Sequence, residues 1–306
     1  MSTIDALGPM GPLKGTLSGV PDKCSPVVLI IPGSGPTDRD GNSVLGIKAA
    51  PYKLLAEGLA AKGIVSARID KRGMFASAAA VPDPDAVTVA DYVDDIHNWI
   101  NTLRRRTGTN AVWLLGHSEG GLVALSALTR ASEHIAGLLL VACPGRPAGE
   151  VLMSQLRANP ANAPLLDAAA KAIAALSSGQ LIDARAVPPA LEALFRPAVQ
   201  SFLISLFALD PAQLIKQVNK PVLILQGKRD LQVGIADAKR LHQFAPASTL
   251  LLIPDTNHVL KRVAVDEPSI NLAAYADANL PLAPGVIEAI ALFVRSNSGQ
   301  TPHQIK

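Results

Sequence analysis

The sequence centres on Gly116-His117-Ser118-Glu119-Gly120. An apolar run, residues 111–115, precedes this pentapeptide, and a segment of helical composition, residues 122–128, follows it. A G-x-S-x-G turn between a strand and a helix holds its serine at a strained apex, and its glycines let strand and helix approach closely. The pattern therefore predicts that Ser118 projects above a sheet edge, beside a helix N-terminus that would stabilise an anion.

Apolar runs alternate with helical patterns on both sides of this turn. The runs predict strands at 13–20, 27–31, 64–69, 111–115, 135–141, 221–227 and 249–253, the first of them a short edge strand. Helices are predicted at 52–62, 91–103, 122–128, 235–244 and 284–295. This alternation is typical of an α/β fold with a mostly parallel central sheet and helices on both faces. Ligands of such sheets bind beyond the carboxyl ends of the strands.

One long stretch, residues 146–218, breaks the alternation. It is rich in alanine and leucine, is punctuated by prolines and contains no convincing strand pattern. We interpret it as a helical cap inserted into a single α/β core. The predicted division is therefore 1–145 for the N-terminal part of the core, 146–218 for the cap or lid, and 219–306 for the C-terminal part of the core.

The composition excludes several classes of protein. Hydrophobic residues make up 49% of the 306 residues, charged ones 17%, and the net charge is only +3, so neither disorder nor a nucleic-acid partner is expected. No N-terminal signal pattern and no apolar run long enough to span a membrane are present, which predicts a cytoplasmic protein unless a leader was removed ahead of residue 1. Two cysteines, Cys24 and Cys143, make no disulfide framework and are expected as buried thiols. Nothing in the sequence fixes the oligomeric state.

A serine hydroxyl is a weak nucleophile and needs a base within hydrogen-bond reach. Among six histidines, His258 follows the last predicted strand and so shares a sheet edge with Ser118. We therefore take His258 as the candidate base. The other histidines fall in helices, are expected to point away from the serine, or have no argument for their position: His97, His117, His134, His242 and His303.

The base in turn needs a carboxylate that orients it. Asp230 follows the predicted strand 221–227 and is the preferred candidate. Asp255 competes, but it lies only three residues before His258 on the same loop and is poorly placed to reach the imidazole from behind. The chain order Ser118, Asp230, His258 is the order of nucleophile, acid and base expected for this turn motif.

Three further motifs add a family resemblance. They are Pro32-Gly33-Ser34-Gly35-Pro36-Thr37-Asp38-Arg39-Asp40-Gly41-Asn42, Asp70-Lys71-Arg72-Gly73 and Asn257-His258-Val259-Leu260-Lys261. With the central turn, they resemble the α/β-hydrolase superfamily, in particular bacterial serine esterases and serine-aminopeptidase-like hydrolases, over nearly the whole chain. The resemblance implies the α/β-hydrolase fold. It also implies an oxyanion hole made by the backbone N–H groups of Glu119 and of Ser34, with Gly35 as the alternative to Ser34.

Charged residues gather in two loops that the fold makes neighbours: Asp38, Arg39 and Asp40 in one, and Arg72 in the other. Ion pairs that hold the oxyanion loop in shape are the preferred interpretation, and recognition of a substrate carboxylate is the alternative. The run 38–42 lacks the glycine position of a calcium loop, and no residue set has zinc spacing. No G-x-G-x-x-G follows the first strand. Neither a metal nor a cofactor is expected.

These observations predict a serine hydrolase that cleaves carboxylic esters of small to medium acyl or alcohol groups through an acyl-enzyme. Its expected partner is a small-molecule ester, because the 146–218 segment is mostly apolar. A peptidase or thioesterase would use the same residues, and a binding protein without turnover on the same fold is a further alternative. A dehalogenase or epoxide hydrolase is disfavoured, since those enzymes need an aspartate where Ser118 stands.

Overall fold

The core of the molecule is an eight-stranded sheet with strand order β1-β2-β4-β3-β5-β6-β7-β8. The computed structural model describes residues 1–298 except 23, 184 and 186. Six neighbouring strands, from β4 to β8, run parallel, while β1 and β2 pair antiparallel at one edge. The mostly parallel sheet predicted from the sequence is thereby confirmed. The strands are β1 Ser2–Ala6, β2 Leu13–Ser18, β3 Val27–Ile31, β4 Val65–Ile69, β5 Val112–His117, β6 Ile135–Val141, β7 Val222–Gly227 and β8 Thr249–Ile253.

The central strands are predominantly apolar because both faces of the sheet are covered. Every residue of β3 is buried, and its side chains alternate between two hydrophobic clusters. Leu29 and Ile31 join the cluster that includes α2 (Val89–Thr107) and α3 (Glu119–Arg130). Val28 and Ile30 join the cluster on the other face, with α1 (Pro51–Ala61) and α11 (Val286–Asn297). A strand buried on both faces needs this continuous apolar run.

Local signals fix several helix ends. Helix α2 begins with a capping box in which Thr88 and Asp91 satisfy each other's backbone N–H groups. It ends at Gly108, whose left-handed φ of 78° closes the helix after three arginines in the last turn. The remaining helices of the core are α9 Ile235–Phe244 and α10 Pro268–Ala273, with short 3₁₀ turns at η1 Phe75–Ala80 and η2 Pro84–Ala86.

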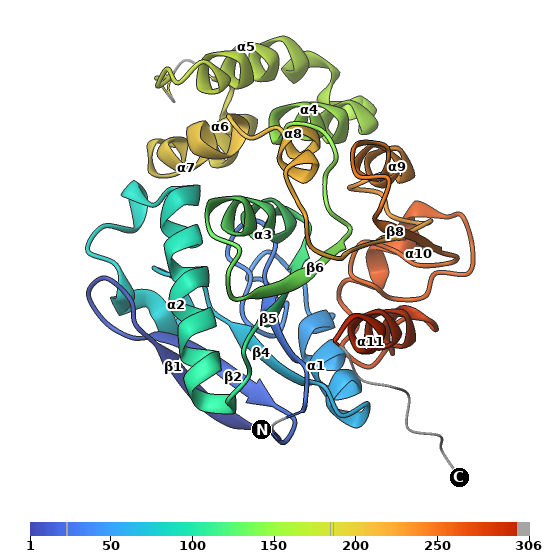
Figure 1. Ribbon diagram of the computed structural model, residues 1–306. Helices are drawn as coiled ribbons and strands as arrows, with labels where there is room; N and C mark the ends of the chain where they lie inside the picture. Colours follow the sequence, from blue (N-terminus) through green and yellow to red (C-terminus); the bar gives the residue numbers. More distant parts are fainter. Residues whose placement is uncertain (23, 184, 186, 299–306) are drawn as a thin grey trace.

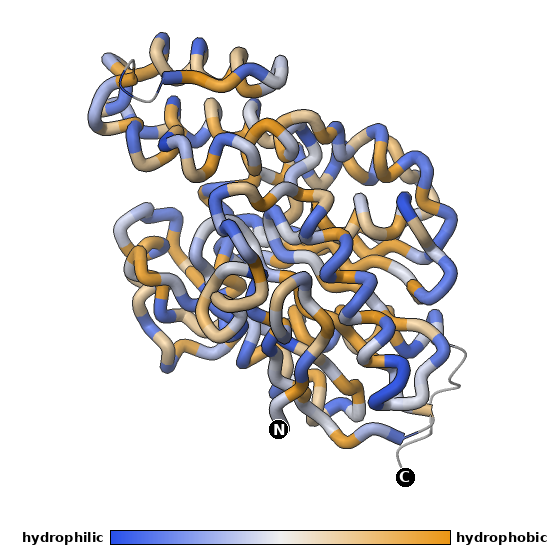
Figure 2. Tube along the Cα trace, turned by 90° about the vertical axis from the view of Figure 1, so that its left-hand side faces the viewer, coloured by the Kyte–Doolittle hydropathy of each residue, from blue (hydrophilic) through white to orange (hydrophobic). Residues whose placement is uncertain are grey.

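The 146–218 segment is helical in its described residues. In Figure 1 its helices stand at the top of the view, above α3. Figure 2 shows hydrophobic and hydrophilic residues alternating along them, which is typical of helices with one buried face. The backbone N–H of Val89 donates to the Ser205 hydroxyl at 2.9 Å and ties this layer to α2. The elements are α4 Ala148–Ala158, η3 Pro160–Leu165, α5 Leu166–Ser177, α6 Pro189–Phe195, α7 Pro197–Phe207 and α8 Pro211–Lys216.

No single helix in the described ranges combines the length and apolar composition of a membrane span; α6 and α7, bent by 63°, meet that test only as a pair. The division of the chain into core and cap stays our prediction, and the last eight residues of the predicted C-terminal part, 299–306, lie outside the described residues.

Some expectations from the sequence were wrong. The first predicted strand exists as β2, but β1 covers its edge, pairing Ile4 with Gly15. Only alternate residues of β1 are buried, so it forms no continuous apolar run that the sequence pattern could reveal. The segment between β4 and α2 contains η1 and η2, and neither these two turns nor α10 was predicted. Of the two cysteines, Cys143 is buried as expected, whereas Cys24 is exposed.

Candidate active site

The turn at Ser118 has the strained geometry that its sequence predicts. Ser118 lies between β5 and α3 with φ 54° and ψ −125°, a backbone conformation that costs energy for any residue with a side chain. Its flanking glycines are required by close approach. A Cβ atom on Gly116 would lie 2.3 Å from the carbonyl oxygen of Gly120, and one on Gly120 would lie 2.4 Å from that of Ile31. The chain therefore keeps Ser118 at a tight apex.

The two residues predicted as base and acid lie together. His258 Nδ1 is 2.8 Å from Asp230 Oδ2, and both side chains are buried. The second carboxylate oxygen of Asp230 accepts the backbone N–H groups of Gln232 and Val233 at 2.8 and 2.9 Å. Burial alone would raise the pKa of Asp230, but the charge of His258 and these hydrogen bonds hold it below its ordinary value. Asp230 is therefore an anion that fixes the proton of the imidazole on Nδ1.

Ser118 is brought to the same edge without a direct bond to the imidazole. Within the described ranges its hydroxyl makes no hydrogen bond, His258 included. The neighbouring ring of His117 packs against that of His258, with centroids 4.8 Å apart, and binds the His258 backbone. Serine–histidine bonds often tighten only when substrate binds. The competing carboxylate, Asp255, instead lies 3.9 Å from Arg262.

His117 is a functional candidate that the sequence reasoning missed. Its Nε2 is 2.8 Å from the carbonyl oxygen of His258, which can only accept, so Nε2 carries a proton. Burial, followed by the positive charge of His258, lowers the pKa of His117 to about 3, so the ring is neutral and its Nδ1 accepts. The hydroxyl of Tyr52 donates to that Nδ1 at 2.9 Å and itself accepts the backbone N–H of Gly33 at 3.0 Å.

These hydrogen bonds form one continuous chain, in which each group donates to the next, from the loop after β3 to the loop after β8.

Alternation of side chains along β5 puts His117 on the same face of the sheet as Trp113 and Leu115, the face covered by α1. That signal could have placed the ring, but nothing in the sequence pairs it with Tyr52.

The predicted oxyanion donors flank the serine. Gly33 lies against it, because a Cβ on Gly33 would come within 3.2 Å of Ser118 Cβ. Across the described part of the chain, the backbone N–H groups of Ser34 and Glu119 have no acceptor within the protein. The N–H of Gly33 is already taken by Tyr52. At Gly35, with φ 69°, a Cβ would meet no atom within 4 Å, so this residue lies farther out on the loop.

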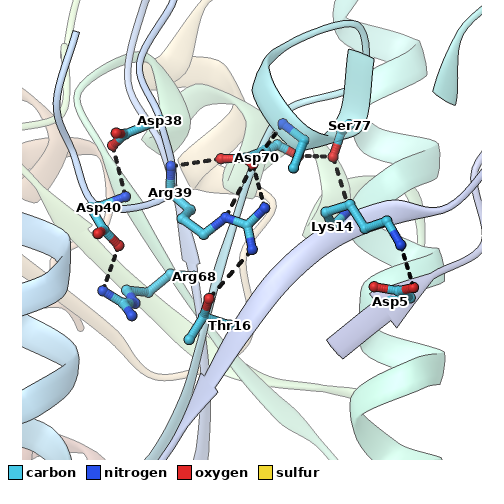
Figure 3. Close-up of polar contacts among 10 residues, drawn as sticks. Asp5, Lys14, Thr16, Asp38, Arg39, Asp40, Arg68, Asp70 and Ser77 are labelled. Carbon is cyan, nitrogen blue, oxygen red and sulfur yellow. Dashed lines mark hydrogen bonds and ion pairs between the residues drawn. The ribbon is translucent and has the colours of Figure 1, made fainter. Parts of the chain in front are cut away.

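The charged residues after β3 stabilise the loop itself, as Figure 3 shows. The Asp38 carboxylate accepts the N–H groups of Asp40 and Asn42 at 2.9 and 2.8 Å. Arg39 pairs with the buried Asp70, with Nη2 2.5 Å from Oδ2. All three guanidinium nitrogens of Arg39 have protein acceptors, which disfavours a role in binding a substrate carboxylate. The partner, Asp70, was not predicted.

Arg72 does not join this network, contrary to expectation. Its Nε and Nη2 each donate to Asp95 at 2.7 Å, and Nη1 donates to Asp91 at 2.8 Å. Burial would lower the pKa of Arg72, but these carboxylates raise it. The physical reason is position: both acids lie on the first two turns of α2, and together they accept from all three guanidinium nitrogens of Arg72. Arg72 therefore anchors α2 to the loop after β4.

Comparison with known proteins identifies the family. The family model described as serine aminopeptidase, S33, matches residues 45–261, which is more than half of the chain. The chain belongs to the serine aminopeptidase S33 family. The predicted resemblance is thus confirmed. A curated relative, esterase EstD of Thermotoga maritima, is 28% identical over 257 residues, covering 80% of this chain. The chain spans only 59% of the length of that esterase.

Solved structures agree with the S33 assignment in their fold. An esterase of Thermogutta terrifontis, solved with malate bound, superposes with a TM-score of 0.59 at 18% identity, covering 97% of this chain and 100% of that one. An esterase of Pyrococcus furiosus gives a TM-score of 0.61 at 14% identity, covering 97% and 91%. Identities this low bear on the fold alone. This S33 family member therefore has the α/β-hydrolase fold predicted from its sequence.

Proposed function

We propose that this protein is a serine hydrolase that cleaves carboxylic esters of small to medium acyl or alcohol groups. The observation that carries the proposal is the strained apex at Ser118, set at the sheet edge where Asp230 and His258 are hydrogen-bonded at 2.8 Å. A strained serine beside an oriented imidazole is the arrangement that activates a hydroxyl for acyl transfer. The similarity to an esterase of Thermotoga maritima supports the same reaction class.

In the proposed mechanism, Ser118 Oγ attacks the acyl carbon while His258 Nε2 takes the hydroxyl proton. Asp230 stabilises the imidazolium through Nδ1. The oxyanion that forms accepts hydrogen bonds from the backbone N–H groups of Ser34 and Glu119. Loss of one such donor typically costs on the order of 10² to 10³ in rate, so the pair supplies several kcal/mol. His258 then gives its proton to the leaving alcohol, and water hydrolyses the acyl-enzyme by the reverse sequence of proton transfers.

An ester is preferred over an amide or a thioester on the character of the proposed lid, the 146–218 segment. Several of its partly buried residues, including Phe202, Leu203 and Ile204 of α7, are apolar and pack against the main cluster. An aminopeptidase would need acidic groups near the acyl carbon to hold a substrate ammonium. The family description names a peptidase, so peptide or aminoacyl-amide cleavage on the same three residues is the second candidate.

The test is hydrolysis of p-nitrophenyl acetate and butyrate by the wild type and by Ser118→Ala, followed by aminoacyl p-nitroanilides. We expect rapid release of p-nitrophenol by the wild type and loss of nearly all of it in the variant. A folded wild type that hydrolyses no activated ester would favour a binding protein instead. Faster turnover of the anilides than of the esters would favour the peptidase.

A further inference from the structure

Gly33, the residue before the proposed oxyanion donor Ser34, is held on both sides of its backbone. Its N–H donates to the Tyr52 hydroxyl at 3.0 Å. Its carbonyl oxygen accepts from Lys71 Nζ at 2.8 Å. Tyr52 and Lys71 are both buried, and neither has a part in the mechanism proposed above. Two buried polar side chains thus meet at one glycine.

The bond from Lys71 determines where the next N–H points. The carbonyl of Gly33 and the N–H of Ser34 belong to one planar peptide unit and point in opposite directions when that unit is trans. The described residues contain no cis peptide bond. An ammonium that holds the Gly33 oxygen therefore also holds the Ser34 N–H, on the opposite side of the peptide plane.

Lys71 also reaches the second proposed donor residue. Its Nζ is 3.8 Å from Oε1 of Glu119, whose backbone N–H is the other member of the proposed hole. Burial lowers the pKa of Lys71, and the charge of Glu119 opposes that effect. A buried ammonium among apolar side chains such as Ile31, Trp99 and Val123 is expensive, and an apolar residue would fill the same space at lower cost. A positioning task accounts for its presence.

Tyr52 has support of its own on the other side. Its hydroxyl donates to His117, which binds the carbonyl oxygen of His258. The N–H end of Gly33 is therefore linked through two side chains to the loop that carries the proposed base. The carbonyl end is linked through Lys71 to the first residue of α3. Gly33 is the point where both links meet.

We propose that Lys71 and Tyr52 are positioning residues that fix the backbone of Gly33 from both sides, so that the Ser34 N–H stays directed at the oxyanion. We call this pair of hydrogen bonds, from Lys71 to the Gly33 oxygen and from the Gly33 N–H to Tyr52, the clamp. The inference rests on the proposed function. An oxyanion exists only in the tetrahedral states of the reaction, so the clamp acts on kcat and leaves KM nearly unchanged. A purely structural role would instead change the stability of the fold without changing kcat per folded molecule.

The experiment compares Tyr52→Phe and Lys71→Met with the wild type on p-nitrophenyl butyrate, with the folded fraction measured by circular dichroism. We expect kcat to fall at least tenfold in each variant, and by no more than the roughly 10² to 10³ that complete loss of one donor costs. KM should stay within about twofold. Tyr92→Phe, at another buried tyrosine, and Lys62→Met, at an exposed lysine, are matched controls that should keep the wild-type kcat.

A double variant distinguishes a loss of positioning from a loss of folding. Lys71→Met leaves the Glu119 carboxylate buried without its cation, so Lys71→Met with Glu119→Gln removes both charges and retains both backbone donors. It should show the same loss in kcat.

The outcomes separate the clamp from the proposed function. If the wild type is active, Ser118→Ala is inactive, and the folded clamp variants keep the wild-type kcat, the clamp is wrong and the function stands. If KM rises in parallel while kcat is kept, the residues bind substrate and the clamp is again wrong. If the folded wild type hydrolyses no ester, amide or thioester, the function fails and the clamp fails with it.

Discussion

Replacing His117 by glutamine should remove much of the acid sensitivity of the fold. The ring is buried between Tyr52 and the backbone of His258, and it is neutral because burial and the neighbouring charge of His258 lower its pKa from 6.5 to about 3. Glutamine is of similar size and keeps an amide N–H that can donate to the His258 carbonyl oxygen. It has no proton to gain in this pH range.

The magnitude follows from the two pKa values. The unfolded chain binds a proton at this histidine near pH 6.5, whereas the folded chain binds it only near pH 3. Between these values the unfolded state holds the extra proton, so the free energy of unfolding falls as the pH falls, by about 1.4 kcal/mol per pH unit. From pH 7.5 to pH 4.5 the loss through His117 alone amounts to about 2.7 kcal/mol.

Urea unfolding of the wild type and His117→Gln at pH 7.5, 6.0 and 4.5 measures this pH-dependent contribution of His117 to the free energy of unfolding. Whatever the offset at pH 7.5, the difference in free energy of unfolding between the two proteins should shift by about 2.7 kcal/mol in favour of the variant at pH 4.5. Other titrating groups occur in both proteins, so their contributions largely cancel in the difference. The groups whose charges act directly on His117 are His258 and Asp230. Parallel curves would refute a neutral, buried His117 and the hydrogen-bond directions derived from it.

Three further variants test separate parts of the site. Asp230→Asn should lower kcat on p-nitrophenyl butyrate by about 10⁴, because an amide favours the wrong imidazole tautomer, and more than a tenth of the wild-type rate would remove Asp230 from the mechanism. Gly120→Ala puts a Cβ atom 2.4 Å from a main-chain oxygen and should lower the free energy of unfolding by about 1–3 kcal/mol or more. Gly234→Ala is the control, because its Cβ would meet nothing closer than 4.0 Å and the stability should not change. Equal melting temperatures of the two variants would contradict the packing argument. Arg72→Met leaves the Asp95 carboxylate unpaired and should cost about 3–5 kcal/mol of stability with little change in kcat per folded molecule. A large loss of kcat would instead indicate that Arg72 supports the oxyanion loop, as the sequence predicted.

The sequence could predict the parts of the site that local patterns encode. Ser118 was predictable because strand, glycine turn and helix are contiguous, and the structure reproduces their strain. His258 and Asp230 followed from the rule that loops after parallel strands meet at one edge. Asp230 was preferred to Asp255 because it lies on a different loop from His258. The central strands were also predictable, because a strand buried on both faces needs a continuous run of apolar residues.

Apart from the pairing of Asp230 with His258, the side-chain contacts that link distant segments of the site could not be predicted. Tyr52 reads as an apolar position of α1, and its hydroxyl meets His117 only because α1 packs on the face of β5. Lys71 reads as one charge in a charged motif, and its bond to Gly33 spans 38 residues of sequence. Arg72 was assigned to the wrong neighbours because loop proximity alone does not say which carboxylate is nearest. Side-chain direction decides such pairs, and only packing determines it.

Covalent labelling tests the central claim most directly. A fluorophosphonate reacts with an activated serine and stays attached, so peptide mapping by mass spectrometry after labelling identifies the nucleophile. Our account predicts one adduct, on the peptide that contains Ser118, with ester hydrolysis lost in proportion to labelling and no adduct in Ser118→Ala. An adduct on another residue, or an active enzyme that stays unlabelled, would contradict it.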